Sequence, residues 1–589
     1  MSQPSAPSTK SKSLADRIIK ASFVVGIAHI LLKFAGLIQA KCCAQFLDDA
    51  EYTAIIAIAM GAILNSLFLI GEEVIGPTFL TLFVKEKDSQ SEEAAWRFTN
   101  VTLSFQSLLL LVVCASIVCF PDAYIGLVTQ LRAPAPPPEG ADAAALALYQ
   151  TQLADFNSVY IPLRNGLRII APGLLFLSLG STTYVLLNGY KKFFLAAFGD
   201  ASTKICIVIG LVAGWKLDMG LNALCLGILA GSVAKLLTHL CGLAGKLRLL
   251  RPSLDWRNHA FRRMLWLMLP LLAGILFAKF RDVFNNIYIL TGDNIPNYEA
   301  VVKANDLGRK LFTTIQWLVP YALQIALFPF LCELVNKNDR QELGKVIGNS
   351  CRLLLAVFIP VSAAILVVGG PLTVLIFAGG KTGVEVASMA GLSTICYSLV
   401  LPVAAIECVL MQGAFADEKT VAVTVIGIAS SLLSVIISYV LIVMVGVDAR
   451  GALLTVSLGF VASRFVKSLL LILHLRRSTP MFEGAQTLAF LARTLLLAVL
   501  VAAAAWAALR GVDAILPSGL AAVADSGTAD ALKAVSRIRL VVHIGVAGLA
   551  GLAAYAIGAW LLRLEEPRLM FQWTVGKALA KVRGRAARR

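Results

Sequence analysis

The sequence predicts an all-α polytopic membrane protein with about fourteen transmembrane helices. Hydrophobic residues make up 58% of the chain and charged residues only 15%, whereas soluble domains carry about 25% charged residues. The mean hydropathy is +0.79. Runs of about 18 or more mostly apolar residues recur along the whole chain, and each can cross a hydrocarbon core of about 30 Å as a helix.

These apolar runs define fourteen expected spans. The spans are 21–45, 53–83, 97–120, 164–189, 193–215, 219–244, 263–290, 305–333, 348–376, 386–413, 420–446, 450–475, 486–510 and 538–564. The second and the eighth are longer than one crossing requires.

The basic loops predict the orientation of the spans. Lys and Arg collect before the first span, in "GKLRLLRPSLDWRNHAFRR" after the sixth, and in "KALAKVRGRAARR" at the end of the chain. All basic loops fall on one side if both termini are cytoplasmic, since short cytoplasmic loops carry the excess of Lys and Arg. The net charge of +17 is therefore mainly a signal of topology. No soluble basic domain is present, so we expect no nucleic-acid partner.

An internal repeat predicts the domain organisation. "FPDAYIGLV" and "YVLLNGYKKFFLA" in the first part match "GPLTVLIFAGG" and "CVLMQGAFADEKT" in the second. Two six-span halves that face each other around a central cavity are the architecture of alternating-access transporters. The expected parts are a disordered cytoplasmic head (1–20), a first lobe (21–244) with an extracytoplasmic insert (131–152), a basic linker (245–262), a second lobe (263–475), two further spans (486–564) and a basic cytoplasmic tail (565–589).

Several kinds of site are not expected. The eleven cysteines lie within apolar spans or at their edges, without CxxC or Cys/His spacing, so we expect neither a disulfide nor a metal site. No Walker A motif occurs, so the chain is not expected to hydrolyse ATP. We expect no catalytic residues and no cofactor.

One long stretch carries a family resemblance. Residues 352–420 resemble the MurJ/MviN branch of the multidrug/oligosaccharidyl-lipid/polysaccharide exporter superfamily, with its Gly-Pro-hydrophobic run, Phe-x-x-Gly turn and Gly-ended span. "ALQIALFPFLCEL", "LRIIAPGLLFLSLGSTTYVLLNGY" and "GEEVIGPTFLTLF" resemble the eighth, fourth and second spans of that branch. The resemblance runs from about residue 20 to 475.

The resemblance implies a transporter rather than an enzyme. Its implied activity is the flipping of lipid II, the undecaprenyl-diphosphate-linked disaccharide peptide, to the outer leaflet of a bacterial plasma (inner) membrane for peptidoglycan synthesis. The implied partners are the lipid-linked glycan, membrane lipids and the cell-wall synthesis machinery. A diphosphate head cannot cross hydrocarbon unaided, so cations inside the bundle are the expected binding groups.

Lys33 is the first of these cations. It lies about 12 residues, or about 18 Å, into span one, hence near the membrane midplane, where a Lys is not expected to face lipid. The family has Arg at this place, whereas this chain reads "KFAG". The alternative is a Lys that pairs with a structural acid.

Spans seven and eight carry a second cationic group. Its members are Lys279, Arg281, Arg309 and Lys310, with Lys310 in register with a family Arg. Residues 279 and 282 share a helix face but 281 does not, so we expect Asp282 to neutralise Lys279 while Arg281 points elsewhere.

Two expected arginines are missing. Gln39 and the neighbourhood of Leu67 stand where the family has Arg. Fewer cations suit a related carrier lipid with a different glycan, such as an exopolysaccharide or O-antigen precursor. A degenerate, non-transporting partner in envelope assembly is a further alternative.

Span two contains an expected cytoplasmic gate, made of Glu72, Glu73, Gly76 and Pro77. Glu72 lies about 19 residues, or about 28 Å, along the span, at the edge of the hydrocarbon. Pro77 removes a backbone hydrogen bond to the carbonyl of Glu73, so we expect a bend beside the two acids.

For energy coupling, the resemblance suggests the membrane potential or a monovalent cation. Asn285 and Glu407 are the candidate ion-coupling residues, against the simpler interpretation that both are structural. His29 and His239 are expected to be satisfied core residues.

Two other classes of protein fit less well. A membrane glycosyltransferase needs a catalytic acid or base in a sizeable extramembrane loop, and the long loops here are Pro/Ala-rich. A drug/cation antiporter needs an acidic cavity, whereas the charge at the midplane is Lys33.

Overall fold

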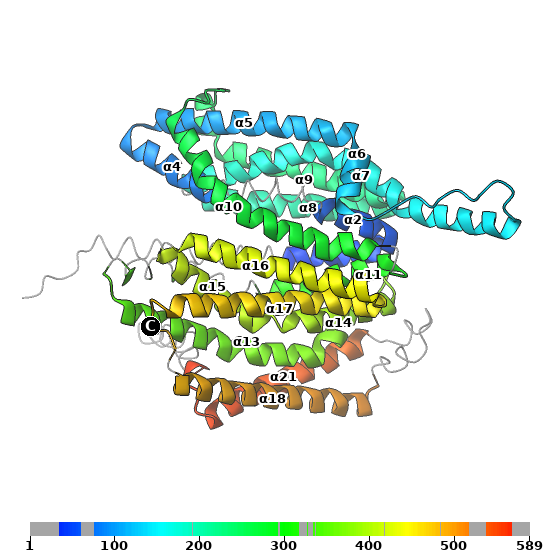
Figure 1. The fold of residues 1–589 in the computed structure, drawn as a ribbon, viewed down its shortest axis with the longest axis vertical. Coiled ribbons are helices and arrows are strands. Elements are labelled where there is room, and N and C mark those ends of the chain that lie inside the picture. The colour runs from blue at the N-terminus through cyan, green and yellow to red at the C-terminus, as the bar shows by residue number, and fades with distance from the viewer. Residues whose placement is uncertain are drawn as a thin grey trace, which may run out of the picture. The chain divides into compact units, whose positions relative to one another are not determined.

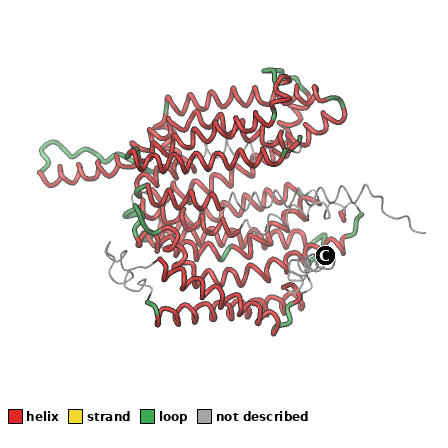
Figure 2. Tube along the Cα trace, turned by 180° about the vertical axis from the view of Figure 1, so that it is seen from behind, coloured by secondary structure: helices red, strands yellow, loops and turns green. Residues whose placement is uncertain are grey.

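The computed structural model describes residues 34–60, 76–190, 192–292, 295–316, 337–417, 419–482, 484–517 and 537–567, with a few single positions inside 317–336. Within these ranges every regular element is a helix, and the one strand-like pairing is an isolated bridge between Gly379 and Thr382 (Figures 1 and 2). The all-α fold is therefore confirmed.

Eleven of the fourteen expected spans are found in the described residues. Nine helices are long and apolar enough to cross a membrane, and two bent pairs bring the number to eleven. They correspond to expected spans three to seven and nine to fourteen. Spans one, two and eight lie partly outside the described residues, so the full number stays a prediction.

The chain divides into two compact units, Met1–Val302 and Lys303–Arg589. The basic stretch 245–262, expected to separate two lobes, therefore lies inside the first unit. One reason is that α10 (His259–Val283) begins against α5 (Glu92–Cys119), where the rings of Phe261 and Phe105 stack at 5.0 Å. The expected six-span lobes stay a prediction.

The first unit is built from helices in chain order. After a helical stretch at 34–46, they are α2 (Asp49–Met60), α4 (Gly76–Ser89), α5, α6 (Pro121–Val128), α7 (Ala143–Gly189), α8 (Phe193–Leu217), α9 (Gly220–Gly242), the short η2 (Ala244–Leu249), α10, η3 (Phe284–Tyr288) and η4 (Ile289–Thr291). α11 (Tyr298–Gln316) crosses the boundary between the units.

Helix α7 is much longer than the expected span 164–189. It has 47 residues, or about 70 Å of helix, because the Ala-rich part of the insert joins the span without a break. Asp142 caps it by accepting a hydrogen bond from the Ala145 backbone N–H at 2.8 Å. The Pro-rich run before it has no helix. The first turns of α7 project past the other helices of this unit (Figure 1).

Small residues bring α8 and α9 close together. A Cβ atom on Gly231 would lie 2.9 Å from the carbonyl oxygen of Thr203, and one on Gly210 would lie 2.9 Å from the Cα atom of Gly227. The Thr203 hydroxyl also donates to the Gly231 carbonyl at 3.1 Å. Such close backbone approach is how helices associate in lipid, where the hydrophobic effect between them is weak.

In the described residues, the second unit continues from α11 with seven α-helices and one π-helical turn. They are α13 (Arg340–Phe377), α14 (Val384–Ser398), α15 (Leu401–Ala416), α16 (Thr420–Tyr439) with the π-helical η5 (Val440–Val445), α17 (Ala449–Arg476), α18 (Gly484–Ile515) and α21 (Arg537–Leu561). The last two pack against α13 through a cluster that includes Ala356, Leu497 and Ala559.

The expected straight span 386–413 is bent by 43° between α14 and α15. Pro402 lies in the first turn of α15 and has no backbone N–H to donate to the Ser398 carbonyl. The Ser362 hydroxyl of α13 donates to that carbonyl at 2.6 Å instead. The bend is therefore stabilised from a neighbouring helix.

Candidate functional site

Three of the predicted site residues, Lys33, Glu72 and Glu73, lie outside the described residues. Gly76 and Pro77 open α4, where Pro is tolerated because the first turn has no intrahelical acceptor for its missing N–H. The expected gate in span two stays a prediction.

The predicted pairing on α10 is wrong in one respect. Arg281 does not point away from Asp282: its Nη2 and Nε atoms lie 2.7 Å and 3.1 Å from the Asp282 Oδ1 atom. Arg281 is only 8% exposed, and a buried guanidinium needs a carboxylate partner. Its long side chain folds along the helix to the adjacent acid, a contact that helix-face spacing does not anticipate. Lys279 lies half-buried on the same helix.

Asn285 lies in the π-helical turn η3, directly after α10, and is 3% exposed. A π-turn shifts the backbone hydrogen-bond register, and such turns are frequent at functional sites. The neighbouring Asn286 amide donates to the Asp282 carbonyl at 2.7 Å. Asn285 therefore sits in irregular, buried backbone, and its role in ion coupling stays a proposal.

In the second unit, α11 carries polar side chains on a buried face. The Lys310 Nζ atom lies 2.7 Å from the Asp306 Oδ2 atom, one turn earlier. Asp306 is nearly buried, whereas Lys310 is 39% exposed. A phosphate that binds Lys310 must therefore share this ammonium group with Asp306. The adjacent Arg309 is half-buried.

Two further polar residues of α11 were not singled out in the sequence. Lys303 is fully buried and its Nζ atom lies 3.5 Å from the Lys381 carbonyl. Asn305 accepts a hydrogen bond from the Tyr397 hydroxyl of α14 at 3.0 Å. These contacts fix the first part of α11 against α14 and the turn before it.

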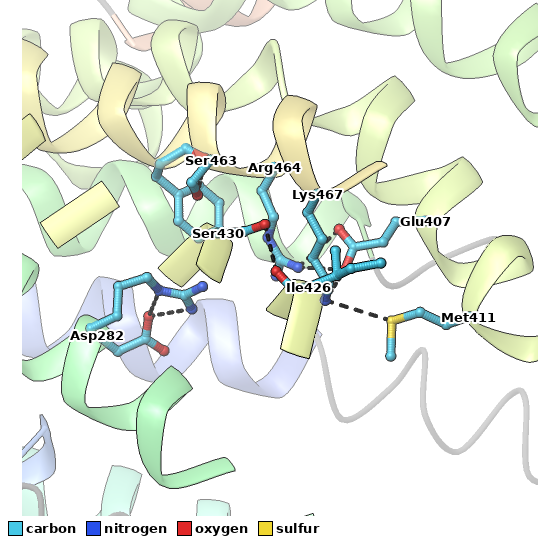
Figure 3. A network of polar contacts seen from close by, with 10 residues as sticks. Asp282, Glu407, Met411, Ile426, Ser430, Ser463, Arg464 and Lys467 are labelled. Atoms are coloured by element: carbon cyan, nitrogen blue, oxygen red, sulfur yellow. Dashed lines mark hydrogen bonds and ion pairs between the residues drawn. The ribbon is translucent and has the colours of Figure 1, made fainter. Parts of the chain in front are cut away.

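Glu407 is the centre of a buried charge cluster (Figure 3). Arg464 and Lys467 extend from α17 towards Glu407 on α15. The Arg464 Nη1 atom lies 2.6 Å and 2.9 Å from the two carboxylate oxygens, and the Lys467 Nζ atom lies 2.6 Å from Oε1. Glu407 is 4% exposed. The carboxylate is therefore buried and paired, and its role in ion coupling stays a proposal.

This cluster, Glu407–Arg464–Lys467, has two cations for one carboxylate, so it carries a net charge of about +1 when all three groups are ionised. Arg464 also keeps a buried Nε donor without a hydrogen-bond partner among the described residues. Its guanidinium lies 5.2 Å from the Phe460 ring centroid. The two cations were missed in the sequence, although their i, i+3 spacing within an apolar span is a signal of one charged helix face.

A pocket in the first unit is the second candidate site. It has a volume of about 500 Å³ and lies between the helical stretch 34–46 and α8. Its lining is apolar, with residues such as Ile38, Phe194 and Phe198, except for Lys204. The Lys204 Nζ atom donates to the Gln39 Oε1 atom at 2.8 Å. A cation beside an apolar pocket suits an amphiphile with an acidic head.

A buried ion pair lies close in sequence to this pocket. The Lys235 Nζ atom is 2.6 Å from the Asp200 Oδ1 atom, and the Lys235 side chain is 1% exposed. His239, one turn later, is fully buried, with ring nitrogens within 3.1 Å of the Thr183 hydroxyl and of the Gly180 and Ala196 carbonyls. The interpretation of His239 as a satisfied core residue is confirmed; His29 lies outside the described residues.

Long apolar helices with paired charges between them define the class as a polytopic membrane protein. Residues 44–515 match the family model described as "Lipid II flippase MurJ". Because this match covers most of the chain, the protein belongs to the MurJ family.

Curated relatives agree with this family. A "Lipid II flippase MurJ" of Burkholderia cenocepacia is 25% identical over 316 residues, which are 53% of this chain and 59% of that protein. A "Probable lipid II flippase MurJ" of Buchnera aphidicola subsp. Schizaphis graminum is 21% identical over 378 residues, 62% of this chain and 66% of that protein. The chain thus spans less than two thirds of the length of these two relatives.

Solved structures agree in fold. An inward closed conformation of the lipid II flippase MurJ has a TM-score of 0.63 at 17% identity and covers 92% of this chain and 99% of that chain. An inward-facing multidrug resistance MATE family transporter of the MOP superfamily has a TM-score of 0.56 at 12% identity, over 77% of this chain and 98% of its own. At these identities the likeness shows the fold alone.

Proposed function

We propose that this chain is a transporter rather than an enzyme and that it moves lipid II from the inner to the outer leaflet of a bacterial inner membrane by alternating access. The observation that carries the proposal is the match of residues 44–515 to the lipid II flippase family. The fold supports it, since the likeness to a MurJ structure covers 99% of that structure.

Cations on the expected spans supply the chemistry that a diphosphate head requires. Desolvating a diphosphate costs several kcal/mol for each charge unless cations replace its water. Lys33, Lys204, Lys279, Arg309 and Lys310 are the proposed phosphate-binding groups. Each ammonium or guanidinium is a charge-assisted donor to phosphate oxygens.

Lys204 takes the place of a missing family cation. Gln39 stands where the family has Arg, and the Lys204 ammonium is held 2.8 Å from its amide oxygen. In this proposal Lys204 of α8 supplies the positive charge that was expected from span one. This replacement favours retention of a diphosphate substrate.

The second candidate substrate is another undecaprenyl-linked oligosaccharide. It is favoured by the apolar neighbourhood of Leu67, where a further family cation is expected and the chain has none in sequence. A degenerate member that assists envelope assembly without transport is the third candidate.

We further propose how transport is driven and how the chain lies in the membrane. Transport is driven by the membrane potential or by a monovalent cation, with Asn285 and Glu407 as the residues to test. Both termini are cytoplasmic, and the cell-wall synthesis machinery receives the flipped substrate. Glu72, Glu73, Gly76 and Pro77 form the cytoplasmic gate.

A panel of substrates tests the proposal. The purified chain is placed in proteoliposomes with fluorescent lipid II, or with undecaprenyl-diphosphate carriers of other glycans, and a membrane-impermeant reagent reports which molecules reach the far leaflet. We expect lipid II to move fastest. Movement of another glycan alone excludes lipid II as the substrate, and movement of none excludes transport. Lys33→Ala is expected to abolish movement.

A further inference from the structure

A second cavity lies entirely within the second unit, between α13, α15, α17 and α18, and we call it the α13/α18 groove. Its volume is about 740 Å³. It is bordered by side chains open to the surroundings, among them Leu366, Leu469 and Leu488, which are 42%, 55% and 70% exposed. In a membrane-spanning bundle, such a groove faces the acyl chains of the bilayer.

The charged residues of the groove gather at one end. The lining is apolar apart from Arg352, Arg476, Thr487, Ser362 and Ser468. Arg352 lies in the early turns of α13, Arg476 is the last residue of α17, and Thr487 lies in the first turn of α18. The apolar wall then runs along α13 to Leu366, about 21 Å further. The α13/α18 groove therefore has a cationic end, followed by a long apolar part.

The two arginines are available to an anion. Among the described residues, no carboxylate pairs with Arg352. Its Nη2 atom donates to the Thr487 hydroxyl at 3.3 Å, and its guanidinium lies 5.9 Å from the Phe490 ring centroid. Arg476 is exposed at the end of its helix. Guanidinium groups bind phosphate through paired N–H donors, and cations near the membrane surface attract anionic lipid.

A further polar atom lies deeper in the wall. The Ser468 hydroxyl is buried, with 3% of the residue exposed, and has no hydrogen-bond partner among the described residues. It lies about 12 Å from Arg476 along α17. A buried hydroxyl calls for an acceptor, and the ester carbonyls of a glycerolipid provide acceptors below a bound phosphate.

We propose that the α13/α18 groove binds one anionic phospholipid of the surrounding membrane, with its phosphate on Arg352 and Arg476 and an acyl chain along α13. The acyl chain alone contributes little binding free energy, because a lipid tail is as well accommodated in the bilayer as in the groove. Selectivity therefore comes from the headgroup charge. The site is separate from the transported substrate and does not depend on the proposed function.

Lipid retention by the full-length protein tests this site. Purified, delipidated protein in neutral detergent is titrated with phosphatidylglycerol, phosphatidylcholine, undecaprenyl phosphate or chain-free glycerol phosphate, and bound molecules are counted by native mass spectrometry. We expect one tight phosphatidylglycerol, and a loss of affinity of about ten-fold or more in the double variant Arg352→Gln/Arg476→Gln. Arg510→Gln is the matched control, because Arg510 also lies beside an aromatic ring of α18, that of Trp506, but does not line the groove. We expect the affinity of this variant for phosphatidylglycerol to be unchanged.

Leu495→Trp keeps both arginines and fills the exposed side of the groove, and it is expected to weaken phosphatidylglycerol binding while gel filtration shows a folded protein. Three results overturn the proposal. They are unchanged binding by the double arginine variant, equal competition by chain-free glycerol phosphate, and preference for undecaprenyl phosphate over phosphatidylglycerol.

Discussion

The ammonium group of Lys204 on α8 donates a hydrogen bond to the amide oxygen of Gln39 at 2.8 Å. This contact places a cation from one helix beside the residue that replaces a family arginine on another. The proposal that Lys204 compensates for the missing arginine can therefore be tested by exchanging the two residues.

Lys204→Gln is expected to slow lipid II transport by about ten-fold or more, because it removes one charge-assisted contact to the diphosphate. The double variant Gln39→Arg/Lys204→Gln is expected to recover most of the rate, since it returns the cation to its family position. Transport in proteoliposomes measures both. Lys216→Gln, an exposed cation at the far end of α8, is the control. Equal rates for Lys204→Gln and the control show that Lys204 has no role in transport.

Glu407→Gln is expected to destabilise the second unit by about 3 kcal/mol, because it leaves the half-buried Arg464 and Lys467 without their carboxylate. Adding Lys467→Met is expected to recover part of the loss, since one uncompensated cation then disappears. Thermal unfolding in detergent measures this double-mutant cycle. If the effects of the two substitutions on the unfolding free energy simply add, the proposed coupling between Glu407 and Lys467 is contradicted.

Asp417 connects three segments outside the membrane spans. Its carboxylate lies 2.5 Å from the Arg340 Nη1 atom and 2.8 Å from the Lys419 Nζ atom. Burial alone would raise the pKa of this carboxyl, but the hydrogen bonds from Lys419 and Arg340 outweigh it and lower the pKa. The resulting stabilisation is present above the ordinary pKa of Asp and is lost as pH falls below it.

Asp417→Asn is therefore expected to lower the unfolding free energy by about 1 to 3 kcal/mol at neutral pH, and by less at acid pH. Glu342→Gln is the control, because its ion pair with Lys345 is exposed and 3.7 Å long; such pairs contribute about 0 to 1 kcal/mol. Chemical or thermal unfolding at two pH values measures the difference. A loss that does not change with pH contradicts the electrostatic explanation.

Glu299, at the start of α11 and outside the membrane spans, has the opposite shift. Burial, together with Asp49, Asp48 and Asp155, raises its pKa to about 7. Because the folded state holds this proton more tightly than the unfolded state, stability falls as pH rises from the ordinary pKa of Glu to about 7.

Glu299→Gln is thus expected to raise the melting temperature at pH about 8 and to change it little at pH about 4.5. After allowance for solvent screening, the gain is on the order of 1 kcal/mol. Thermal unfolding across this pH range measures it. A variant that is equally stabilised at both pH values contradicts the raised pKa.

The helices were predictable because their apolar runs are long and uninterrupted. The details that were missed depend on tertiary contacts. The bend at Pro402 required the Ser362 hydroxyl from another helix, and the extension of α7 required the Ala-rich insert to continue the same helix. Spacing along one helix also misassigned the Arg281–Asp282 pair, since a long arginine side chain reaches its neighbour.

The candidate site was less predictable than the fold. Glu407 was singled out from its position near the end of an expected span. Its partners Arg464 and Lys467 lie about 60 residues further along the chain, and one sequence does not show which spans pack together. Lys204 was passed over for the same reason. Lys33 and the acids of span two lie outside the described residues, so their roles stay predictions.

The central claim is that this chain flips lipid II, and the most direct measurement is made in cells. In a bacterium depleted of its own lipid II flippase, the chain is expressed and the fraction of lipid II open to a membrane-impermeant reagent at the outer face is measured. We predict that the chain restores this fraction and that Lys33→Ala does not. If lipid II stays inaccessible while the chain is present in the membrane at a normal level, the account is contradicted.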